Sequence, residues 1–307
     1  MRGFGLFGVC CTLLAGSALA CGTEERCIGA GESQFGVALG YGRLDNPLVA
    51  APDTQFYAYP QFAWYGERFY FDNGDFGYTL VDDGHWLINL TTGFSQDSFY
   101  FQDWGGSSFA LPVFAISRVS YEYLPEDMPV DDPQAQPGAA EGGASAAPPA
   151  EEPVLVGERQ LAMPHAWAWL AGPEVQYFWD ADEVAVRLLQ DVSTVHNGTL
   201  LNLRYGHRFE FGRWTLSTRL GLDWKSRELV DHYYSVTPET NPVSYTAYDA
   251  KATVDSIVQL SASYPLDAHW RVLVQGEYRR LGDGIADSPR VTERNLTHYF
   301  LGLGYAF

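Results

Sequence analysis

Asp191, Ser193 and His196 are the residues of this chain whose types and spacing could form a nucleophilic site. A serine hydroxyl activated by a histidine, which an aspartate orients, is the arrangement that many hydrolases use. The next two residues, Asn197-Gly198, are a strong signal for a tight turn, and polar side chains beside a turn commonly bond to its backbone. The GxSxG and HExxH motifs and metal-ligand spacings are absent from the sequence. We therefore expect these three residues to hold a turn, and we predict no catalytic, cofactor-binding or metal-binding residues.

Charged residues recur at alternate positions of the neighbouring segments, and they admit two interpretations. In one, they form a ladder of ion pairs that fills the interior of a closed sheet. In the other, they line a narrow channel, whose surplus of arginine would favour anions. Both interpretations place these side chains on one face of their strands. The residues are Arg187, Arg204, Arg208, Glu210, Arg219, Asp223, Arg271, Glu277 and Arg279.

The segment Arg213 to Lys225 indicates which kind of strand positions these charges. One face reads Trp-Leu-Thr-Leu-Leu-Trp from Trp214 to Trp224, and the other face is polar apart from Gly221. A period of two indicates a β-strand. A strand of this length, tilted at roughly 40°, covers about 25 Å, which is the height of the apolar band of an outer-membrane barrel. Aromatic residues close such a band at both edges, as the two tryptophans do here.

The composition agrees with strands that span a membrane. The 307 residues are 46% hydrophobic and 15% aromatic, and no run of eighteen apolar residues occurs outside the N-terminus. A helical membrane protein is therefore excluded, and any spanning must be done by strands. The net charge of −19, without a cluster of Lys or Arg, argues against binding nucleic acid or anionic lipid through a basic patch.

Residues 1–20 are predicted to be an export signal, because an apolar stretch follows Arg2 and Ala18-Leu19-Ala20 is a cleavage site. Cys21 and Cys27 then remain in the exported chain. They are either an inert pair or a small disulfide of an oxidising compartment, and Cys21 is alternatively a site of lipidation.

The rest of the chain is predicted to be an all-β protein. Residues 21–32 form a periplasmic N-terminal segment, and 33–307 form a transmembrane antiparallel up-and-down β-barrel of about twelve strands, with ten possible. Residues 125–153, rich in Pro, Ala and acidic residues, are predicted to be a disordered loop. Phe307 ends an alternating last strand, and such a terminal aromatic residue is the usual signal to the barrel-assembly machinery.

Loop lengths predict the orientation. In bacterial barrels the periplasmic turns are short and the extracellular loops are long. In our strand count Asn73-Gly74 is a bulge or kink within one strand, Phe109 to Tyr123 is a fifth strand, and the insert lies outside the cell. The loop at 96–108 is the exception, since it is long and falls on the periplasmic side. The short periplasmic connections are those near Gly66, Asp180, Gly212 and Asp267.

Three segments resemble the MipA/OmpV family of outer-membrane proteins, also called MltA-interacting proteins. They are YPQFAWYGERFYFDNGDFGYTLVDDG at 59–84, LLQDVSTVHNGTLLNLRYGHRFEFGRWTLSTRLGLDW at 188–224 and RRLGDGIADSPRV at 279–291. The resemblance implies a non-enzymatic scaffold in the outer membrane of a Gram-negative bacterium. Such a scaffold brings a murein-degrading lytic transglycosylase and a murein-synthesising penicillin-binding protein together. The acidic insert and the cysteine pair depart from the family pattern.

The resemblance gives no surface for these partners. Because the periplasmic turns are short, we predict docking at residues 96–108 and at the N-terminal segment Cys21 to Ser33. The alternative to a scaffold is a narrow, anion-preferring channel of the outer membrane, and an outer-membrane hydrolase is the third possibility.

Overall fold

The computed structural model describes residues 32–49, 51–102, 107–110, 165–237 and 247–307. The predicted export signal, the two cysteines of the exported chain and the insert at 125–153 lie outside the described residues, so the predictions about them stay predictions. Within the described ranges, regular structure is mostly β-strand.

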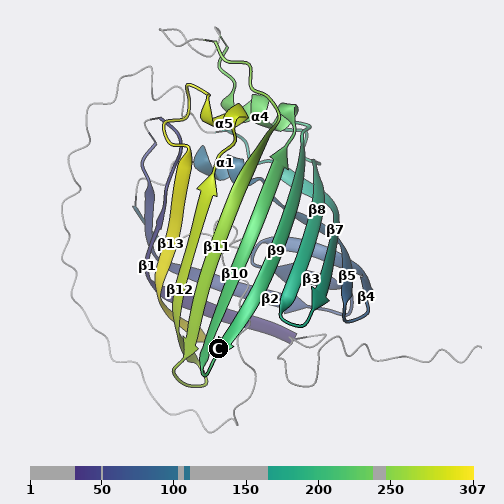
Figure 1. Ribbon diagram of the computed structural model, residues 1–307, viewed down its shortest axis with the longest axis vertical. Helices are drawn as coiled ribbons and strands as arrows, with labels where there is room; N and C mark the ends of the chain where they lie inside the picture. The colour runs from purple at the N-terminus through teal and green to yellow at the C-terminus, as the bar shows by residue number, and fades with distance from the viewer. Residues whose placement is uncertain (1–31, 50, 103–106, 111–164, 238–246) are drawn as a thin grey trace, which may run out of the picture.

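Twelve antiparallel strands of the described chain form a closed barrel (Figure 1). They are β1 (Glu32–Leu44), β2 (Thr54–Tyr65), β3 (Phe69–Asp72), β4 (Asp75–Asp82), β5 (Trp86–Phe94), β7 (Trp169–Trp179), β8 (Asp182–Asp191), β9 (Thr199–Phe211), β10 (Trp214–Lys225), β11 (Thr253–Pro265), β12 (Trp270–Arg280) and β13 (Asn295–Ala306). Each strand pairs with its neighbour in this order, and β1 also pairs with β13, which closes the ring. The predicted fold class and the count of twelve strands are confirmed.

The outer surface of the barrel is apolar and the inner surface is polar, the reverse of a water-soluble protein. On β10, Trp214, Leu222 and Trp224 are exposed, while Asp223 and Lys225 are buried. Exposed aromatic residues recur near both edges of this apolar surface, as the girdles of an outer-membrane barrel do. On one side they are Tyr41, Tyr57, Tyr278 and Tyr299 with Trp224, and on the other Trp86, Trp270 and Phe307 with Trp214.

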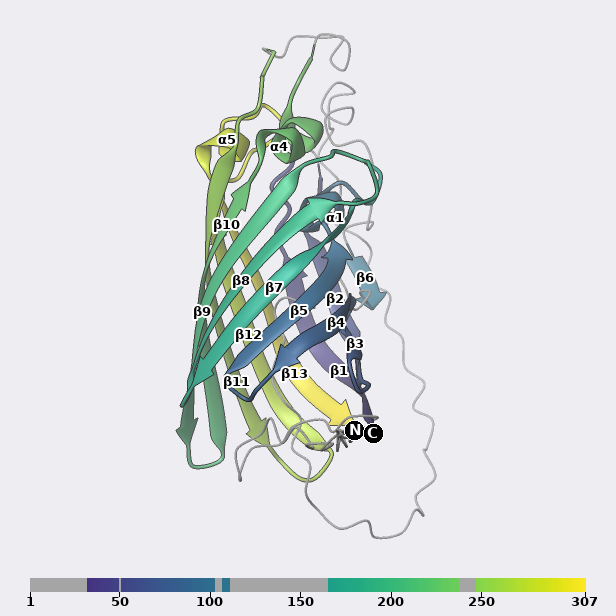
Figure 2. The same cartoon turned by 90° about the vertical axis from the view of Figure 1, so that its right-hand side faces the viewer.

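The two ends of the barrel differ in the length of their connections (Figures 1 and 2). At one end, which we call the short-turn end, the connections have two to four residues, and the C-terminus lies there. The other end, the long-loop end, carries α1 (Gln96–Tyr100), α4 (Arg227–Tyr234) and α5 (Asp283–Ala286). None of the helices in the described ranges has the length and apolar character needed to cross a membrane.

Asn73-Gly74 is a turn, which corrects the predicted bulge. Asn73 and Gly74 have φ angles of 46° and 104°, and the chain reverses so that Asp72 pairs with Asp75. The segment predicted as one strand is therefore the hairpin β3–β4. The additional reversal makes β5 run toward the long-loop end. Residues 96–102 consequently lie at that end, whereas the sequence predicted them beside the short turns.

β6 (Ser107–Ala110) lies outside the ring and pairs in parallel with β2. β3 pairs with β2 only over Ala63 to Tyr65, because the hairpin is short, and β6 pairs with β2 nearer the long-loop end, at Gln55 to Ala58. Of the predicted fifth strand at 109–123, only 109 and 110 belong to the described residues, and they are part of β6.

Candidate functional site

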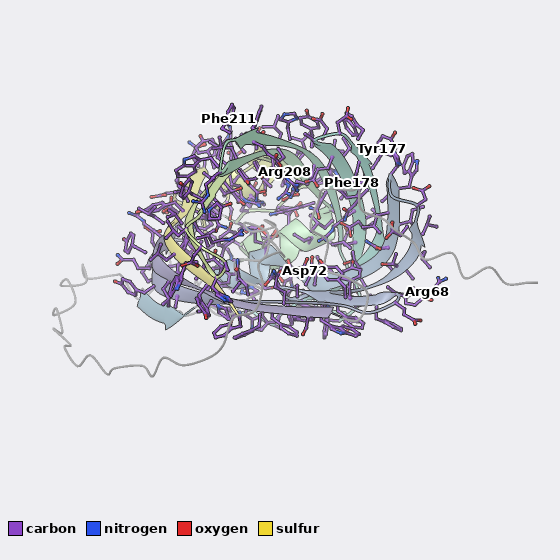
Figure 3. The ribbon with its side chains drawn as sticks, turned by 90° about the horizontal axis from the view of Figure 1, so that it is seen from below. Arg68, Asp72, Tyr177, Phe178, Arg208 and Phe211 are labelled. Carbon is purple, nitrogen blue, oxygen red and sulfur yellow. The ribbon has the colours of Figure 1, made fainter. Side chains whose placement is uncertain are left out.

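The charged side chains of the barrel gather on its inner surface. Seen from the short-turn end, Arg208 and Asp72 point into the space that the strands enclose, while Arg68 and Phe211 point away from it (Figure 3). An interior position of this kind is what both interpretations of the alternating charges required. The contacts between the charges decide which interpretation fits better.

Carboxylates neutralise the inward arginines layer by layer. Nearest the short turns, Arg219 pairs with Glu183 at 2.8 Å. Deeper in the barrel, Arg187 contacts Glu174 and Asp75, each at 2.7 Å, and so joins β7 and β4 through β8. These contacts confirm the predicted ladder for most of the inward charges. The predicted residues with an ion-pair partner are Arg187, Arg204, Arg219, Asp223, Glu277 and Arg279.

Arg279 is the centre of the layer below the long-loop end. Its guanidinium contacts the carboxylates of Asp223 at 3.0 Å and Glu277 at 3.1 Å, and the side chain is fully buried. It also donates to Gln96 Oε1 at 2.8 Å. Because Gln96 begins α1, this bond ties the helix to the barrel wall.

Lys225 makes a second connection between the wall and α1. Its ammonium lies 2.7 Å from Asp97 on α1 and 2.9 Å from Asp255 on β11. Tyr234 of α4 donates to the same Asp97 oxygen at 2.7 Å. Burial opposes ionisation of Asp97, but the Lys225 ammonium and the Tyr234 hydroxyl outweigh it and lower the pKa of this carboxyl.

Apolar side chains complete this closure of the long-loop end. In α4, Leu229, Val230, Tyr233 and Tyr234 share one helical face and are buried. Tyr233 stacks on Phe101 with ring centroids 5.5 Å apart, and its hydroxyl lies 2.7 Å from Ser98 Oγ. We call α1, α4 and the contacts between them the plug. Burial of each large apolar side chain contributes about 1.5–3 kcal/mol, so the plug is held by packing as well as by ion pairs.

Solvent exposure falls from the short-turn end toward the plug. The side chains of Arg219 and Glu183 are 22% and 30% exposed. Those of Lys225 and Asp97, where the wall meets the plug, are 4% and 2% exposed. The described part of the interior is therefore a cup that water enters from the short-turn end and that the plug closes at the other.

The three residues with a possible nucleophilic role hold the turn after β8. Asp191 Oδ1 accepts from the Ser193 backbone N–H at 2.8 Å and from its hydroxyl at 2.6 Å, while Oδ2 accepts from the backbone N–H of His196 and Asn197. The serine hydroxyl thus donates to the aspartate and not to the histidine. His196 Nδ1 accepts from Gly198 N–H at 2.8 Å and stands 3.8 Å from the carboxylate. In a triad, the serine hydroxyl would donate to one ring nitrogen of the histidine, and the other ring nitrogen would donate to the aspartate.

A group of histidines lies between this turn and the plug. The ring centroid of His232 is 5.3 Å from that of His165 and 6.0 Å from that of His196. Because His196 Nδ1 is an acceptor, its Nε2 carries the proton and is not available as a neutral metal ligand. Among the described residues, moreover, no group of three or more His, Cys, Asp or Glu side chains is arranged to hold a metal ion.

Comparison with known proteins adds a family to this geometry. The family described as "MltA-interacting protein MipA" matches residues 35–307, which is nearly the whole barrel. The chain belongs to the MipA family. It is therefore a protein of the bacterial outer membrane, and homologues in the family carry that location in their names.

Individual MipA-family relatives match over shorter stretches. The "MltA-interacting protein" of Escherichia coli (strain K12) is 26% identical over 139 residues, which are 45% of this chain and 56% of the relative. The "Outer membrane protein OmpV" of Vibrio cholerae is 24% identical over 36% of this chain and 44% of its own length. The chain thus spans about half the length of the curated relatives it matches. Among solved structures, an anion-selective porin from Comamonas acidovorans is 10% identical, with a TM-score of 0.31, and the match covers 90% of this chain and 100% of the porin.

The two most particular motifs of the MipA resemblance both lie at the long-loop end. One is the turn after β8, and the other, Gly282 to Val291, contains α5. In the second motif Ser288 Oγ donates to the Tyr234 carbonyl at 2.5 Å and Arg290 Nε donates to the Ser235 carbonyl at 3.1 Å. A Cβ at Gly282 would collide with the Val254 carbonyl. Both motifs therefore fix the plug and its surrounding loops.

The plug is what the sequence reasoning missed in this MipA barrel. No helix or strand was predicted in the long connection after β10, although apolar residues at 229, 230, 233 and 234 have the spacing of one helical face. No sequence pattern pointed to Asp97, because the ion-pair partner of a single acidic residue in a loop cannot be predicted when the direction of the loop is unknown. Lys225 was placed on the polar face of its strand, but its partners Asp97 and Asp255 were not predicted.

Proposed function

We propose that this barrel is a non-enzymatic scaffold whose short-turn end holds a lytic transglycosylase, and with it a penicillin-binding protein. The observation that carries the proposal is membership of a family described as MltA-interacting proteins. We infer that the short-turn end faces the periplasm, because bacterial barrels have short periplasmic turns and long extracellular loops. Enzymes that act on murein would meet the barrel at that end.

The plugged interior supports a scaffold over a channel. A channel needs a continuous aqueous path, whereas the plug covers the long-loop mouth with buried ion pairs and stacked aromatic rings. The inward arginines that would attract anions are largely neutralised by carboxylates. The anion-preferring channel therefore remains only as an outcome of conductance measurements.

The surface available for docking is the short-turn rim, which replaces the predicted docking loop 96–108. Residues 96–102 form α1 and its continuation beneath the opposite end, so they are not on the same side as the short turns. Exposed charges of the described short-turn rim are mainly acidic, and a partner should offer basic residues to it. The acidic residues are Glu67, Asp82, Asp83, Asp180, Glu210 and Asp267, and the basic ones are Arg68 and Arg213.

The test is binding of the mature protein in detergent to a purified lytic transglycosylase from the same envelope. Glu67 and Glu210 are exposed and hold no turn, so E67Q/E210Q removes charge without disturbing the fold. We expect the double variant to weaken binding about threefold to tenfold, and added salt to weaken wild-type binding.

The matched control is E228Q/E293Q, which removes two exposed carboxylates at the long-loop end. It should bind as the wild type does. Loss of binding in this control but not in E67Q/E210Q would place the partner at the wrong end for the proposal. No binding at all, together with steady single-channel conductance, would favour the anion channel.

A further inference from the structure

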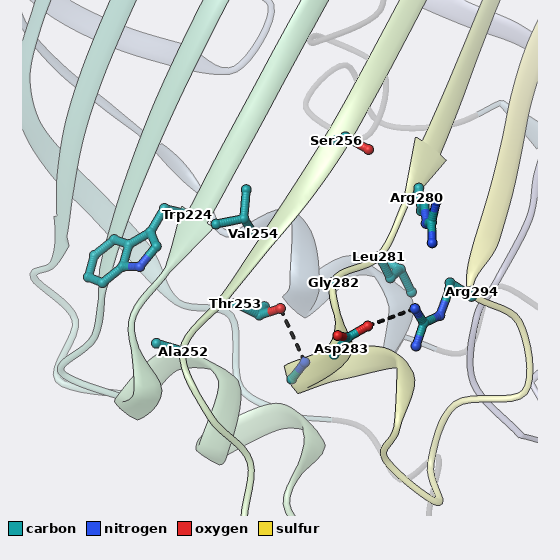
Figure 4. A pocket seen from close by; sticks show the side chains of 11 residues that line it. Trp224, Ala252, Thr253, Val254, Ser256, Arg280, Leu281, Gly282, Asp283 and Arg294 are labelled. Carbon is teal, nitrogen blue, oxygen red and sulfur yellow. Dashed lines mark hydrogen bonds and ion pairs between the residues drawn. The ribbon is translucent and has the colours of Figure 1, made fainter.

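The outer surface of the barrel has an open hollow of about 540 Å³ where β10, β11 and β12 meet the loop that contains α5 (Figure 4). Trp224 and Val254 line it from the strands, and both are exposed side chains of the lipid-facing surface. Arg280 and Arg294 line it from the side of β12 and β13, and lie near one another in the view of Figure 4. Asp283, which pairs with Arg294, also lines it, so the hollow has an apolar side and a charged side that contains two arginines.

Arg280 is the residue that makes this hollow a candidate binding site. It is exposed at the end of β12, and it has no ion-pair partner among the described residues. Arg294 lies beside it and is paired with Asp283 at 2.7 Å and Asp287 at 3.0 Å. Two carboxylates share the one guanidinium of Arg294, so the charges of this group and Arg280 sum to zero, and Arg280 is the cation that no described carboxylate contacts.

The height of the hollow in the membrane defines its ligand. Trp224, Tyr278 and Tyr299 are exposed aromatic residues at the long-loop edge of the apolar band. Arg280 follows Tyr278 by two positions on the same face of β12, so it lies at the level where lipid head groups begin. Arginine binds phosphate through a planar fork of N–H donors, and the apolar residues below it would contact acyl chains.

We propose that this hollow binds the phosphate-bearing head group of an outer-leaflet glycolipid, with Arg280 on the phosphate and Trp224 and Val254 against the acyl chains. The assignment uses the inference that the long-loop end faces outward, and it is independent of any murein enzyme. It also explains why an arginine without an ion-pair partner among the described residues lies at the membrane boundary of a protein with a net charge of −19.

Native mass spectrometry of the full-length protein in detergent tests the site with two probes, diphosphoryl and monophosphoryl lipid A. The wild type should retain the diphosphoryl form more strongly. R280Q should weaken its binding about fivefold, and R280K should fall between the two, because lysine keeps the charge but lacks the fork.

R68Q is the matched control, since Arg68 is an exposed arginine at the short-turn edge that points away from the barrel. It should bind lipid A as the wild type does, and all variants should keep the wild-type gel mobility before boiling. Equal binding by R280Q and the wild type, or an equal loss in R68Q, would refute the site. Displacement of lipid A by inorganic phosphate would also overturn it, because the hollow would then be a site for free anions.

Discussion

Lys225 is a buried cation at the end of a lipid-spanning strand, and two carboxylates neutralise it. A buried ion pair stabilises little compared with an apolar isostere, but removing one partner leaves the other charges buried and unpaired. In K225M, Asp97 and Asp255 would lose their shared cation.

We therefore expect K225M to lower the free energy of unfolding by about 3–5 kcal/mol, measured as the folded fraction on unboiled gels across a urea series. K251M is the control, because Lys251 is exposed on the neighbouring loop, and it should change stability by less than about 0.5 kcal/mol. Equal stability of K225M and the wild type would mean that water reaches the two carboxylates.

His232 gives the plug a dependence on pH. Burial lowers the pKa of His232, and burial also lowers that of its neighbour His196 despite the nearby Asp191. A histidine whose pKa is lower in the folded state binds its proton more readily when unfolded, so stability rises with pH. The loss begins as pH falls through the unfolded value of about 6.5 and continues down to the folded pKa.

We expect the wild type to lose stability between pH 7.5 and pH 5.5, and H232Q to lose less over the same interval. Urea midpoints at the two pH values measure the difference. The variant E293Q, at an exposed carboxylate of the same end, should keep the wild-type slope. A slope unchanged in H232Q would assign the pH dependence to other groups.

At the scale of elements, the strands were predictable and the plug was not. Alternation of apolar and polar residues identifies a lipid-spanning strand such as β10, because lipid and lumen impose opposite requirements on its two faces. The hairpin β3–β4 was not predicted, because the alternation of apolar and polar residues continues on both sides of Asn73-Gly74. The same two residue types also occur at bulges and at turns, so they did not distinguish the two. The ion pairs of α1 depend on the direction of β5, so one missed turn hid them as well.

The turn at Asn73 should therefore contribute more to the stability of the barrel than its length of two residues indicates. Asn73 exchanges two hydrogen bonds with the backbone of Phe62, at 2.9 and 3.0 Å, beside the short ladder between β2 and β3. N73A loses the side-chain bonds to Phe62 N–H and to Asp72 Oδ1, and it forces alanine into a left-handed conformation. We expect a loss of about 1–3 kcal/mol in the same urea assay.

N73G separates the two contributions of this residue. Glycine accepts the positive φ but makes no side-chain bond, so N73G should lie between N73A and the wild type. If N73A is as stable as the wild type, β6 rather than the hairpin secures this edge of β2.

At the scale of the whole molecule, the revised strand direction still brings the flanks of the insert to the long-loop end. Gln102 donates to the His165 carbonyl at 3.0 Å, so the described residues on either side of the insert meet there. The expectation that 125–153 lies outside the cell is therefore retained. Five strands of the ring precede the insert, as predicted, but the fifth is β5 and not the segment at 109–123. The position of the insert itself stays a prediction.

The proposed orientation, with the cup closed on the outside and open to the periplasm, can be tested on the whole barrel. Ser217 lies on the inner face of β10, near the partly exposed pair of Arg219 and Glu183. In a chain whose Cys21 and Cys27 are replaced by serine, S217C should react with a membrane-impermeant maleimide only after the outer membrane is permeabilised. E293C, at the long-loop end, should react on intact cells. Reaction of both cysteines on intact cells would show that reagent passes the plug, and it would move the assignment from a scaffold to a channel. Reaction of S217C but not E293C on intact cells would reverse the orientation.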